Sequence, residues 1–234
     1  MLNADRYIRQ LPLIGVDGQR RLRGSSVLVV GLGGLGSIIS MYLAGAGVGK
    51  LVLVDFDTVS ISDLHRQLLY TTNDVGRPKV DVAEKRLREI NPEVEVEGYR
   101  LVADLNGEFD EIVSSVDIIA LAVDNMKTRY VVDELASRHG KAIVNGGVDG
   151  WFGLVTTVIP NKTPRLSEIL NIRGMNPASC VEGLCNAVIG PVAGIVASWQ
   201  ALEVIRILAG LEPALAGKIL IIDSSRGIMD VVKL

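Results

Sequence analysis

Two short apolar runs near the start of the chain give the first indication of its fold. Residues 26–30 (SVLVV) and 50–54 (KLVLV) show no polar alternation, which is typical of parallel strands buried on both faces. Between them, residues 37–46 have the length and spacing of a helix. A strand, a helix and a second strand within about thirty residues form the βαβ unit of an α/β fold.

The alternation of strands and helices continues along the chain. Further strands are predicted at residues 93–99, 115–123, 141–147, 218–222 and 227–232, and further helices at 78–90, 125–139 and 191–209. Residues 154–160 predict an extended segment near the sheet edge, and the polar stretch 161–179 predicts a long loop. No repeat or low-complexity linker interrupts this order. We therefore predict a single domain over 1–234, with a Rossmann-like, mixed but mainly parallel sheet and helices on both faces.

Composition and charge exclude several classes of protein. Hydrophobic residues make up 48% of the chain and charged residues 22%, which excludes a disordered or fibrous chain. The 24 Lys and Arg against 27 Asp and Glu leave a net charge of −3, so no general positive field would attract nucleic acid or an anionic membrane. Residues 25–49 and 183–202 are uncharged and long enough to cross a bilayer, but the glycines of the first and Asn186 and Gln200 in the second favour buried core segments.

The N-terminal sequence and the cysteines bear on the compartment. The first twenty residues are charged and do not resemble a signal peptide. Cys180 and Cys185 are too few for a disulfide framework. These features predict a cytoplasmic protein.

A glycine-rich turn follows the first predicted strand. Gly31, Gly33, Gly34 and Gly36 fit G-x-G-x-x-G with one additional glycine, and bare backbone N–H groups at a helix N-terminus attract phosphate. Asp55 ends the second strand, where its carboxylate can accept hydrogen bonds from both ribose hydroxyls. The pattern predicts nucleotide binding, and the alternative is that the glycines only allow tight packing of helix on strand. An NAD-linked dehydrogenase would show the same residues, so the nucleotide stays open at this point.

The segment after Asp55 is dense in polar and basic side chains, namely Asp57, Ser62, Asp63, His65, Arg66, Gln67, Arg77 and Lys79. Attack on an α-phosphate builds negative charge that Arg, Lys and Mg²⁺ stabilise, so Arg66 and Lys79 are candidate catalytic residues, and the alternative is that they are solvated surface charges. Asp124 and Asn125 follow the strand that ends at Val123, at the edge where open parallel sheets bind ligands. Asp124 could hold Mg²⁺ or cap the following helix.

Several segments occur together in an order typical of one family: Arg6-Tyr7-Ile8-Arg9-Gln10, GLGGLG, DFDTVSISDLHRQ, Gly76-Arg77-Pro78-Lys79, Val123-Asp124-Asn125 and Cys180-Val181-Glu182-Gly183. On these motifs the chain resembles the MoeB/ThiF/HesA family, relatives of the ubiquitin-activating enzymes, and it is most similar to MoeB. The resemblance implies an adenylyltransferase that uses ATP and Mg²⁺. Its substrate would be the C-terminal glycine carboxylate of a ubiquitin-fold sulfur carrier or modifier ending in Gly-Gly, its product pyrophosphate, and its assembly a homodimer.

The resemblance also implies residue roles by position: Gly34 contacts the nucleotide, Asp55 the ribose, the segment from Ser62 to Arg66 the base-side loop and phosphates, Lys79 the phosphates, and Asp124 Mg²⁺. Arg9 would reach the triphosphate of the other subunit. Residues 1–24 would form a helical arm, 25–150 the nucleotide-binding half, and 151–234 the carrier-binding half with a crossover loop.

Two features depart from the family pattern, and a third, Cys180, matches a cysteine that only some relatives use. Asp63 replaces the Asn of the usual S-N-L-x-R-Q loop, which adds negative charge near a triphosphate, and its side chain would turn away or take a metal. Two zinc-binding CxxC pairs are absent, so zinc is not expected, and Arg165 and Glu168 could form a salt bridge at the position of the first pair. Cys180 aligns with a cysteine that some relatives link covalently to the carrier, so it is a possible nucleophile or else a buried packing residue.

Two alternative functions from other classes remain. One is an NAD-dependent Rossmann oxidoreductase, which would have no evident use for Arg66 and Lys79. The other is an inactive scaffold subunit of a heterodimeric activating enzyme, and the presence of Arg9, Arg66, Lys79 and Asp124 argues against it.

Overall fold

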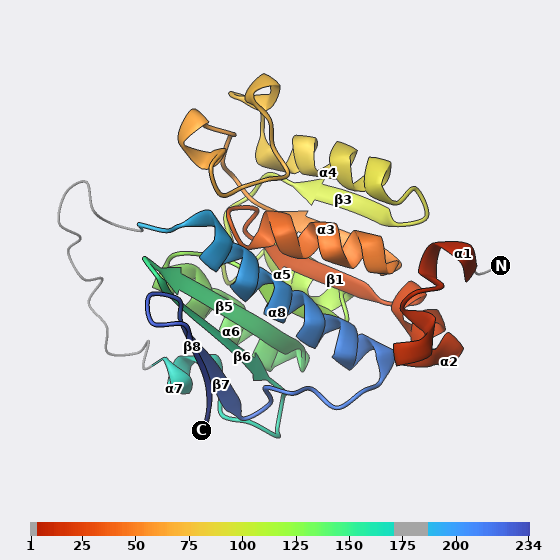
Figure 1. The fold of residues 1–234 in the computed structure, drawn as a ribbon, viewed down its shortest axis with the longest axis vertical. Coiled ribbons are helices and arrows are strands. Elements are labelled where there is room, and N and C mark those ends of the chain that lie inside the picture. Colours follow the sequence, from red (N-terminus) through yellow and green to blue (C-terminus); the bar gives the residue numbers. More distant parts are fainter. Residues whose placement is uncertain (1–3, 171–186) are drawn as a thin grey trace.

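The computed structural model describes residues 4–170 and 187–234 and contains an eight-stranded sheet (Figure 1). The strands are β1 (Ser26–Val30), β2 (Lys50–Val54), β3 (Glu95–Tyr99), β4 (Ile118–Leu121), β5 (Ala142–Asp149), β6 (Phe152–Val158), β7 (Lys218–Asp223) and β8 (Ile228–Lys233). The helices are α1 (Ala4–Tyr7), α2 (Leu11–Arg23), α3 (Gly36–Ala46), α4 (Lys79–Ile90), α5 (Glu108–Ser115), α6 (Met126–His139), α7 (Leu166–Ile169) and α8 (Gly190–Ala209). Two short 3-10 turns, Ile61–Asp63 and Thr72–Asp74, lie between β2 and α4.

The sheet has the strand order β3-β2-β1-β4-β5-β6-β7-β8. The first five strands in this order are parallel, and β6, β7 and β8 continue the sheet in antiparallel fashion. The predicted fold class, a mixed and mainly parallel Rossmann-like sheet, is confirmed. The expectation that residues 154–160 lie near the sheet edge is wrong, because β7 and β8 pair beyond β6. Short turns join the antiparallel pairs β5–β6 and β7–β8, whereas the chain passes through α7 and α8 between β6 and β7.

Helices cover both faces of the sheet because the central strands are apolar on both sides. Along β1, Val27 and Val29 belong to the cluster under α3, α4 and α8, whereas Leu28 and Val30 belong to the cluster under α5 and α6. Successive side chains of a strand point to opposite faces, so a continuously apolar run serves both layers. The parallel strands therefore lie in the interior of the molecule.

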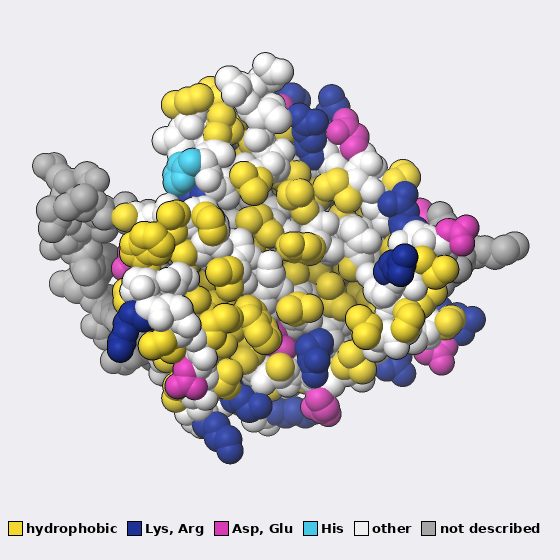
Figure 2. All heavy atoms as spheres, viewed as in Figure 1, with side chains coloured by type: hydrophobic (Ala, Val, Ile, Leu, Met, Phe, Trp, Pro, Cys, Tyr) yellow, Lys and Arg dark blue, Asp and Glu magenta, His cyan; other side chains and the backbone are white. Residues whose placement is uncertain are grey.

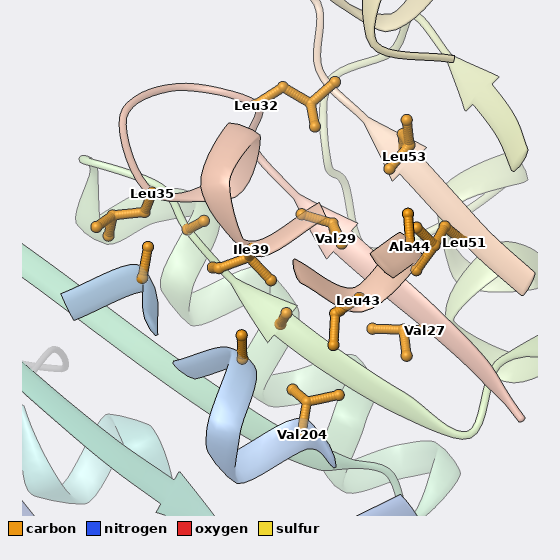
Figure 3. Close-up of a cluster of buried hydrophobic side chains, with 14 of the residues drawn as sticks. Val27, Val29, Leu32, Leu35, Ile39, Leu43, Ala44, Leu51, Leu53 and Val204 are labelled. Atoms are coloured by element: carbon orange, nitrogen blue, oxygen red, sulfur yellow. The ribbon is translucent and has the colours of Figure 1, made fainter. Parts of the chain in front are cut away.

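Helix α8 is long and apolar enough, by length and composition alone, to cross a membrane. In the structure it lies over the sheet (Figure 1), and half of its apolar stretch is buried. Figure 3 shows Val204 of α8 in one cluster with Ile39 and Leu43 of α3. Buried Gln200 donates to two backbone carbonyls at the ends of β4 and within β5, and buried Glu203 accepts from a threonine hydroxyl of β6. The sheet thus supplies partners for the Gln200 amide N–H groups and for Glu203, as is expected of a core helix, although the buried Gln200 Oε1 has no hydrogen-bond partner among the described residues.

Most predicted boundaries differ from the structure by one or two residues, and two elements differ more. The strand expected over 115–123 covers only Ile118–Leu121, because Ser115 ends α5, whose residues Phe109, Ile112 and Val113 form a buried face at helical spacing. Within the loop expected over 161–179, the described residues 161–170 contain the short helix α7. Residues 171–186 lie outside the described part of the chain.

Candidate active site

The carboxyl ends of the parallel strands open into a cleft of about 1110 Å³. Its lining includes these predicted site residues: Gly31, Gly33, Gly34, Asp55, Asp57, Asp63, Arg66, Gln67, Lys79, Asp124 and Asn125. Gly36, Ser62 and Arg9 do not line it, and Cys180 lies outside the described residues. A cleft at this edge is where open α/β sheets bind ligands.

The glycines of the loop between β1 and α3 divide into two pairs. Gly31 has φ 87°, and a Cβ on it would lie 2.7 Å from the carbonyl oxygen of Ala122; a Cβ on Gly36 would lie 1.8 Å from the Gly31 oxygen. These two glycines permit close packing of the loop against β4 and of α3 against β1. At Gly33 and Gly34 an added Cβ would keep at least 3.4 Å from its neighbours, and both residues line the cleft. Tight packing and ligand access are thus served by different glycines.

Asp55 is held rigidly in the cleft wall at the end of β2. Its Oδ2 accepts the Leu32 N–H at 2.6 Å and its Oδ1 accepts the Asp57 N–H at 2.8 Å. Burial raises the pKa of this carboxyl, and the two backbone N–H donors oppose that rise. Each carboxylate oxygen has further acceptor capacity, so the group can still accept hydrogen bonds from a ligand.

The two candidate catalytic cations are both paired with carboxylates. The Lys79 Nζ lies 3.4 Å from Asp57 Oδ2 and 3.7 Å from Asp63 Oδ2, and the Lys79 side chain is only 6% exposed. Asp63 is buried; its Oδ1 lies 3.3 Å from Arg66 Nη2 and accepts from Gln67 Nε2 at 2.9 Å. The expectation that Asp63 turns away from the phosphate end is therefore wrong, because the side chain faces both cations.

Asp124 and Asn125 connect β4 to α6. Asn125 is the N-cap of α6, since its side-chain oxygen accepts the Thr128 N–H at 2.8 Å. The alternative role of Asp124 as the helix cap is therefore wrong. Asp124 is exposed at the cleft, and among the described residues its carboxylate has no hydrogen-bond or salt-bridge partner.

Arg129 is a cleft residue that the sequence analysis missed. It is buried on α6 and donates to the carbonyls of Val123 and Gly146, at 2.5 and 3.0 Å, and to the side chain of Asn145. Burial lowers the pKa of Arg129 to about 10, and the Asp124 carboxylate opposes this shift. Arg129 lies four residues after Asn125, and this spacing could have placed it on the same helix face as that cleft residue. From sequence alone, however, an arginine in a helix is usually interpreted as a solvent-exposed charge.

The apolar lining of the cleft was also missed. Phe56, Leu101, Val102 and Ala103 follow the ends of β2 and β3, whereas Phe152, Leu154, Ile219 and Ile221 lie on β6 and β7, further along the strand order. Ile219 and Ile221 are two residues apart on β7, so the sequence indicates that they share one face of the strand. It does not indicate that this face lines the cleft. These residues come from segments far apart in sequence, so only the folded sheet brings them together.

The expected salt bridge between Arg165 and Glu168 is wrong. The Arg165 guanidinium instead contacts Asp133 at 3.0 Å and Glu134 at 2.8 Å, and the Glu168 carboxylate accepts the Arg165 backbone N–H at 2.9 Å. Asp133 on α6 is buried and attracts the guanidinium more directly than the first-turn carboxylate of α7 can. Across residues 4–170 and 187–234, no three His, Cys, Asp or Glu side chains are grouped to hold a metal ion.

A model of the ThiF family matches residues 5–234, nearly the whole chain. The protein belongs to the ThiF family. It is 39% identical to the sulfur carrier protein adenylyltransferase of Thermus thermophilus, over 94% of this chain and 83% of that protein. It is also 39% identical to the molybdopterin-synthase adenylyltransferase of Haemophilus influenzae, over 93% of this chain and 89% of that protein.

Solved structures place this ThiF-family chain in the same fold as more distant proteins. Escherichia coli MccB superposes with a TM-score of 0.86 at 24% identity, covering 100% of this chain and 70% of MccB. PaaA superposes with a TM-score of 0.85 at 25% identity, covering 98% of this chain and 73% of PaaA. The predicted family and the predicted enzyme class, an adenylyltransferase that uses ATP, are confirmed. An NAD-dependent oxidoreductase and an inactive scaffold are not favoured.

Proposed function

We propose that this protein uses ATP to adenylate the C-terminal carboxylate of a small ubiquitin-fold carrier protein that ends in Gly-Gly. The observation that carries the proposal is a cleft with both polar and apolar lining. The glycine loop, Arg66 and Lys79 line it together with Phe152, Leu154, Ile219 and Ile221 of β6 and β7, beside which an extended tail could lie next to a nucleotide. The relative from Thermus thermophilus is named a sulfur carrier protein adenylyltransferase, which supports this substrate class.

The proposed reaction is an in-line displacement at the α-phosphorus. A tail carboxylate oxygen forms a bond to phosphorus, the bond to the oxygen bridging the α- and β-phosphates breaks, and pyrophosphate leaves with that electron pair. A terminal carboxylate is already ionised near neutral pH, so no protein base is required. The protein's contribution is orientation and charge stabilisation. Arg66 and Lys79 would stabilise the phosphate charge, and Asp55 would orient the ribose through its hydroxyls.

Asp124 fits the role of a magnesium ligand. Its carboxylate is exposed at the cleft and makes no hydrogen bond or ion pair within the described chain. Mg²⁺ is usually held by one or two carboxylates together with substrate phosphates and water. When bound, the ion would neutralise part of the phosphate charge.

We further propose a homodimer in which Arg9 serves the cleft of the partner. Arg9 is exposed, and the adjoining Gln10 donates from Nε2 to the Ala46 carbonyl at 2.8 Å, at the carboxyl end of α3. The glycine loop lies at the opposite end of α3, about 16 Å away for an eleven-residue helix. Arg9 therefore cannot easily serve the cleft of its own chain.

An exposed apolar face gives such a dimer a plausible contact. Figure 2 shows hydrophobic side chains gathered on the outer face of the layer formed by α3 and α8. They include Tyr42, Ile195 and Leu202, which are 54%, 38% and 50% exposed. A contiguous exposed apolar face is typical of a protein interface.

Strands β6, β7 and β8 are the proposed carrier-facing surface. Phe152 and Ile221 line the cleft and remain about half exposed, and β8 is an edge strand exposed along its whole length. An exposed edge and an apolar strand face are suited to an extended peptide. A cytoplasmic location, where ATP is present, completes the proposal, and Cys180 is retained as a possible nucleophile for a later step.

Exchange of radiolabelled pyrophosphate into ATP tests the proposed function. The protein is incubated with Mg²⁺ and each Gly-Gly-ended ubiquitin-fold protein of the same source, and with a matched carrier that lacks its last glycine. We expect exchange with one intact carrier, none with the shortened carrier and none with Lys79→Ala. ATP binding without carrier-dependent exchange would overturn the substrate class, and a lack of ATP binding would overturn the whole proposal.

A further inference from the structure

We propose that Asp63 is an internal counter-ion of the cleft that couples nucleotide binding to a divalent cation. In this arrangement, the Asp63 carboxylate forms ion pairs with Arg66 and Lys79, the two cations that a triphosphate would otherwise contact. Nucleotide complexed with a divalent cation then competes for the site far better than nucleotide alone. The inference rests on the proposed function only in taking ATP as the ligand.

The position of Asp63 carries the argument. Its side chain is 10% exposed, and it lies within salt-bridge distance of both Arg66 and Lys79. Its Oδ2 also accepts the Ser60 N–H at 3.0 Å, which fixes the carboxylate at the third position of the 3-10 turn Ile61–Asp63. A charge held this firmly cannot move aside at no energetic expense when phosphate arrives.

The remaining charges of the cleft do not favour a bare triphosphate. In the described part of the chain the cleft is lined by five carboxylates and three cations, namely Asp55, Asp57, Asp63, Asp124 and Asp149 against Arg66, Lys79 and Arg129. Lys79 lies between two of these carboxylates. A metal-free triphosphate is more negative than its magnesium complex, so this lining opposes the metal-free form more strongly.

The orientation of the Gln67 side-chain amide is a further consequence of the charge on Asp63. A carboxylate only accepts hydrogen bonds, so the amide N–H group of Gln67 must face Asp63. Its buried Oε1 then has no hydrogen-bond partner among the described residues. Asp63 thus removes a possible donor from the phosphate end as well as adding charge. An asparagine at this position would let the Gln67 amide rotate without losing its contact.

Calorimetric titration of ATP with Mg²⁺ and with EDTA measures the coupling directly. The quantity compared is the ratio of the two dissociation constants for the wild-type protein, Asp63→Asn and Asp74→Asn. Asp74 is the matched control, because it is also buried, also caps a 3-10 turn and also pairs with two cations, Arg77 and Arg86, but does not line the cleft.

We expect Asp63→Asn to bind metal-free ATP about tenfold more tightly than the wild type, with a smaller gain for magnesium-bound ATP. The ratio therefore shrinks in Asp63→Asn and stays at the wild-type value in Asp74→Asn. A loss of structure alone would raise both dissociation constants by the same factor and would leave their ratio unchanged. If Asp63→Asn does not fold, Asp63→Ser, whose hydroxyl can still accept the Ser60 N–H, supplies the same comparison.

An unchanged ratio in the Asp63 variant, or an equal change in Asp74→Asn, would overturn the inference. Failure of the proposed function gives a different result, because the wild-type protein would then bind no ATP in Mg²⁺ or would bind it without carrier-dependent exchange.

Discussion

At the scale of single residues, the buried carboxyl of Asp55 lowers folding stability at a position that is suited to bind a nucleotide. Asp55 is buried with its charge, and this burial raises the pKa of its carboxyl. A carboxyl with a folded-state pKa above its unfolded value favours folding fully only below the unfolded pKa, and that contribution is lost as the pH rises through the folded pKa. The ionised form of Asp55 therefore works against the nucleotide-free fold. Ribose hydroxyls that donate to it would offset this effect.

A pH dependence of nucleotide affinity follows from the raised pKa of Asp55. Hydroxyl donors bind the ionised carboxylate, so ATP affinity should fall as the pH drops through the raised pKa, by up to about tenfold per pH unit. Titration of ATP at decreasing pH, within the range where the protein stays folded, measures the slope. An affinity that stays constant while the Asp55 carboxyl resonance titrates would contradict the ribose role.

Two glycines of α3 offer a second comparison at the residue scale. Gly36→Ala should lower the free energy of unfolding by about 3 kcal/mol or more and should abolish ATP binding, because the new Cβ would overlap a backbone oxygen of the loop. Gly45→Ala is the control in the same helix, since no atom lies within 4 Å of its added Cβ. It should raise stability by about 0.5–1 kcal/mol. Urea unfolding of both variants checks the pair, and equal effects would rule out the packing role of Gly36.

At the scale of elements, ionic contacts join α7 to α6. The buried Asp133 of α6 accepts the N–H groups of Leu166 and Ser167, at 3.0 and 3.2 Å, as well as the Arg165 guanidinium. One carboxylate thus satisfies two of the backbone donors at the start of a helix too short to hold itself. The position of α7 depends on this contact rather than on helix propensity.

Removal of that carboxylate should loosen α7. We expect Asp133→Ala to lower the free energy of unfolding by about 2–4 kcal/mol, because buried N–H donors lose their acceptor and Arg165 loses a partner. Asp17→Ala removes an exposed carboxylate, 84% exposed and paired with Arg20, and should change stability by no more than about 0.5 kcal/mol. Urea unfolding compares the two. A similar small effect for both would mean that α7 is held by its apolar contacts instead.

At the scale of the whole molecule, the N-terminal arm and the cleft lie at opposite ends of the sheet. Figure 1 shows α1 and α2 beside the amino ends of the parallel strands, whereas the cleft opens at their carboxyl ends. The apolar face of α3 and α8 lies between these two ends. A symmetric pair of chains joined on that face could bring each arm toward the cleft of its partner.

Mixing two inactive variants tests this arrangement. Arg9→Ala and Lys79→Ala should each lack pyrophosphate exchange, and a mixture allowed to exchange subunits should recover about a quarter of the wild-type activity if each site takes Arg9 from its partner. Sedimentation shows whether mixed dimers form. Recovery would be absent if each chain used its own Arg9. Tyr42→Glu places a charge on the apolar face and should yield inactive monomers if the sites are shared. Unchanged activity in Tyr42→Glu would contradict the shared sites.

The sequence by itself determined the features that depend on neighbours in the chain. The period of apolar residues gave the first βαβ unit, and glycine spacing after β1 together with Asp55 predicted a nucleotide cleft, because loop conformation and helix start are local properties. The motif order gave the family. The structure then brought Asp55, Arg66, Lys79 and Asp124 to one cleft, as the strand-end rule expects.

Tertiary structure alone decided which distant groups meet. Sheet order made β6 an inner strand, burial turned Arg129 into a link between β4 and β5, and packing set Asp63 against both cations. These outcomes depend on how elements pack and on which buried polar groups must find partners, and no local pattern of residues encodes either.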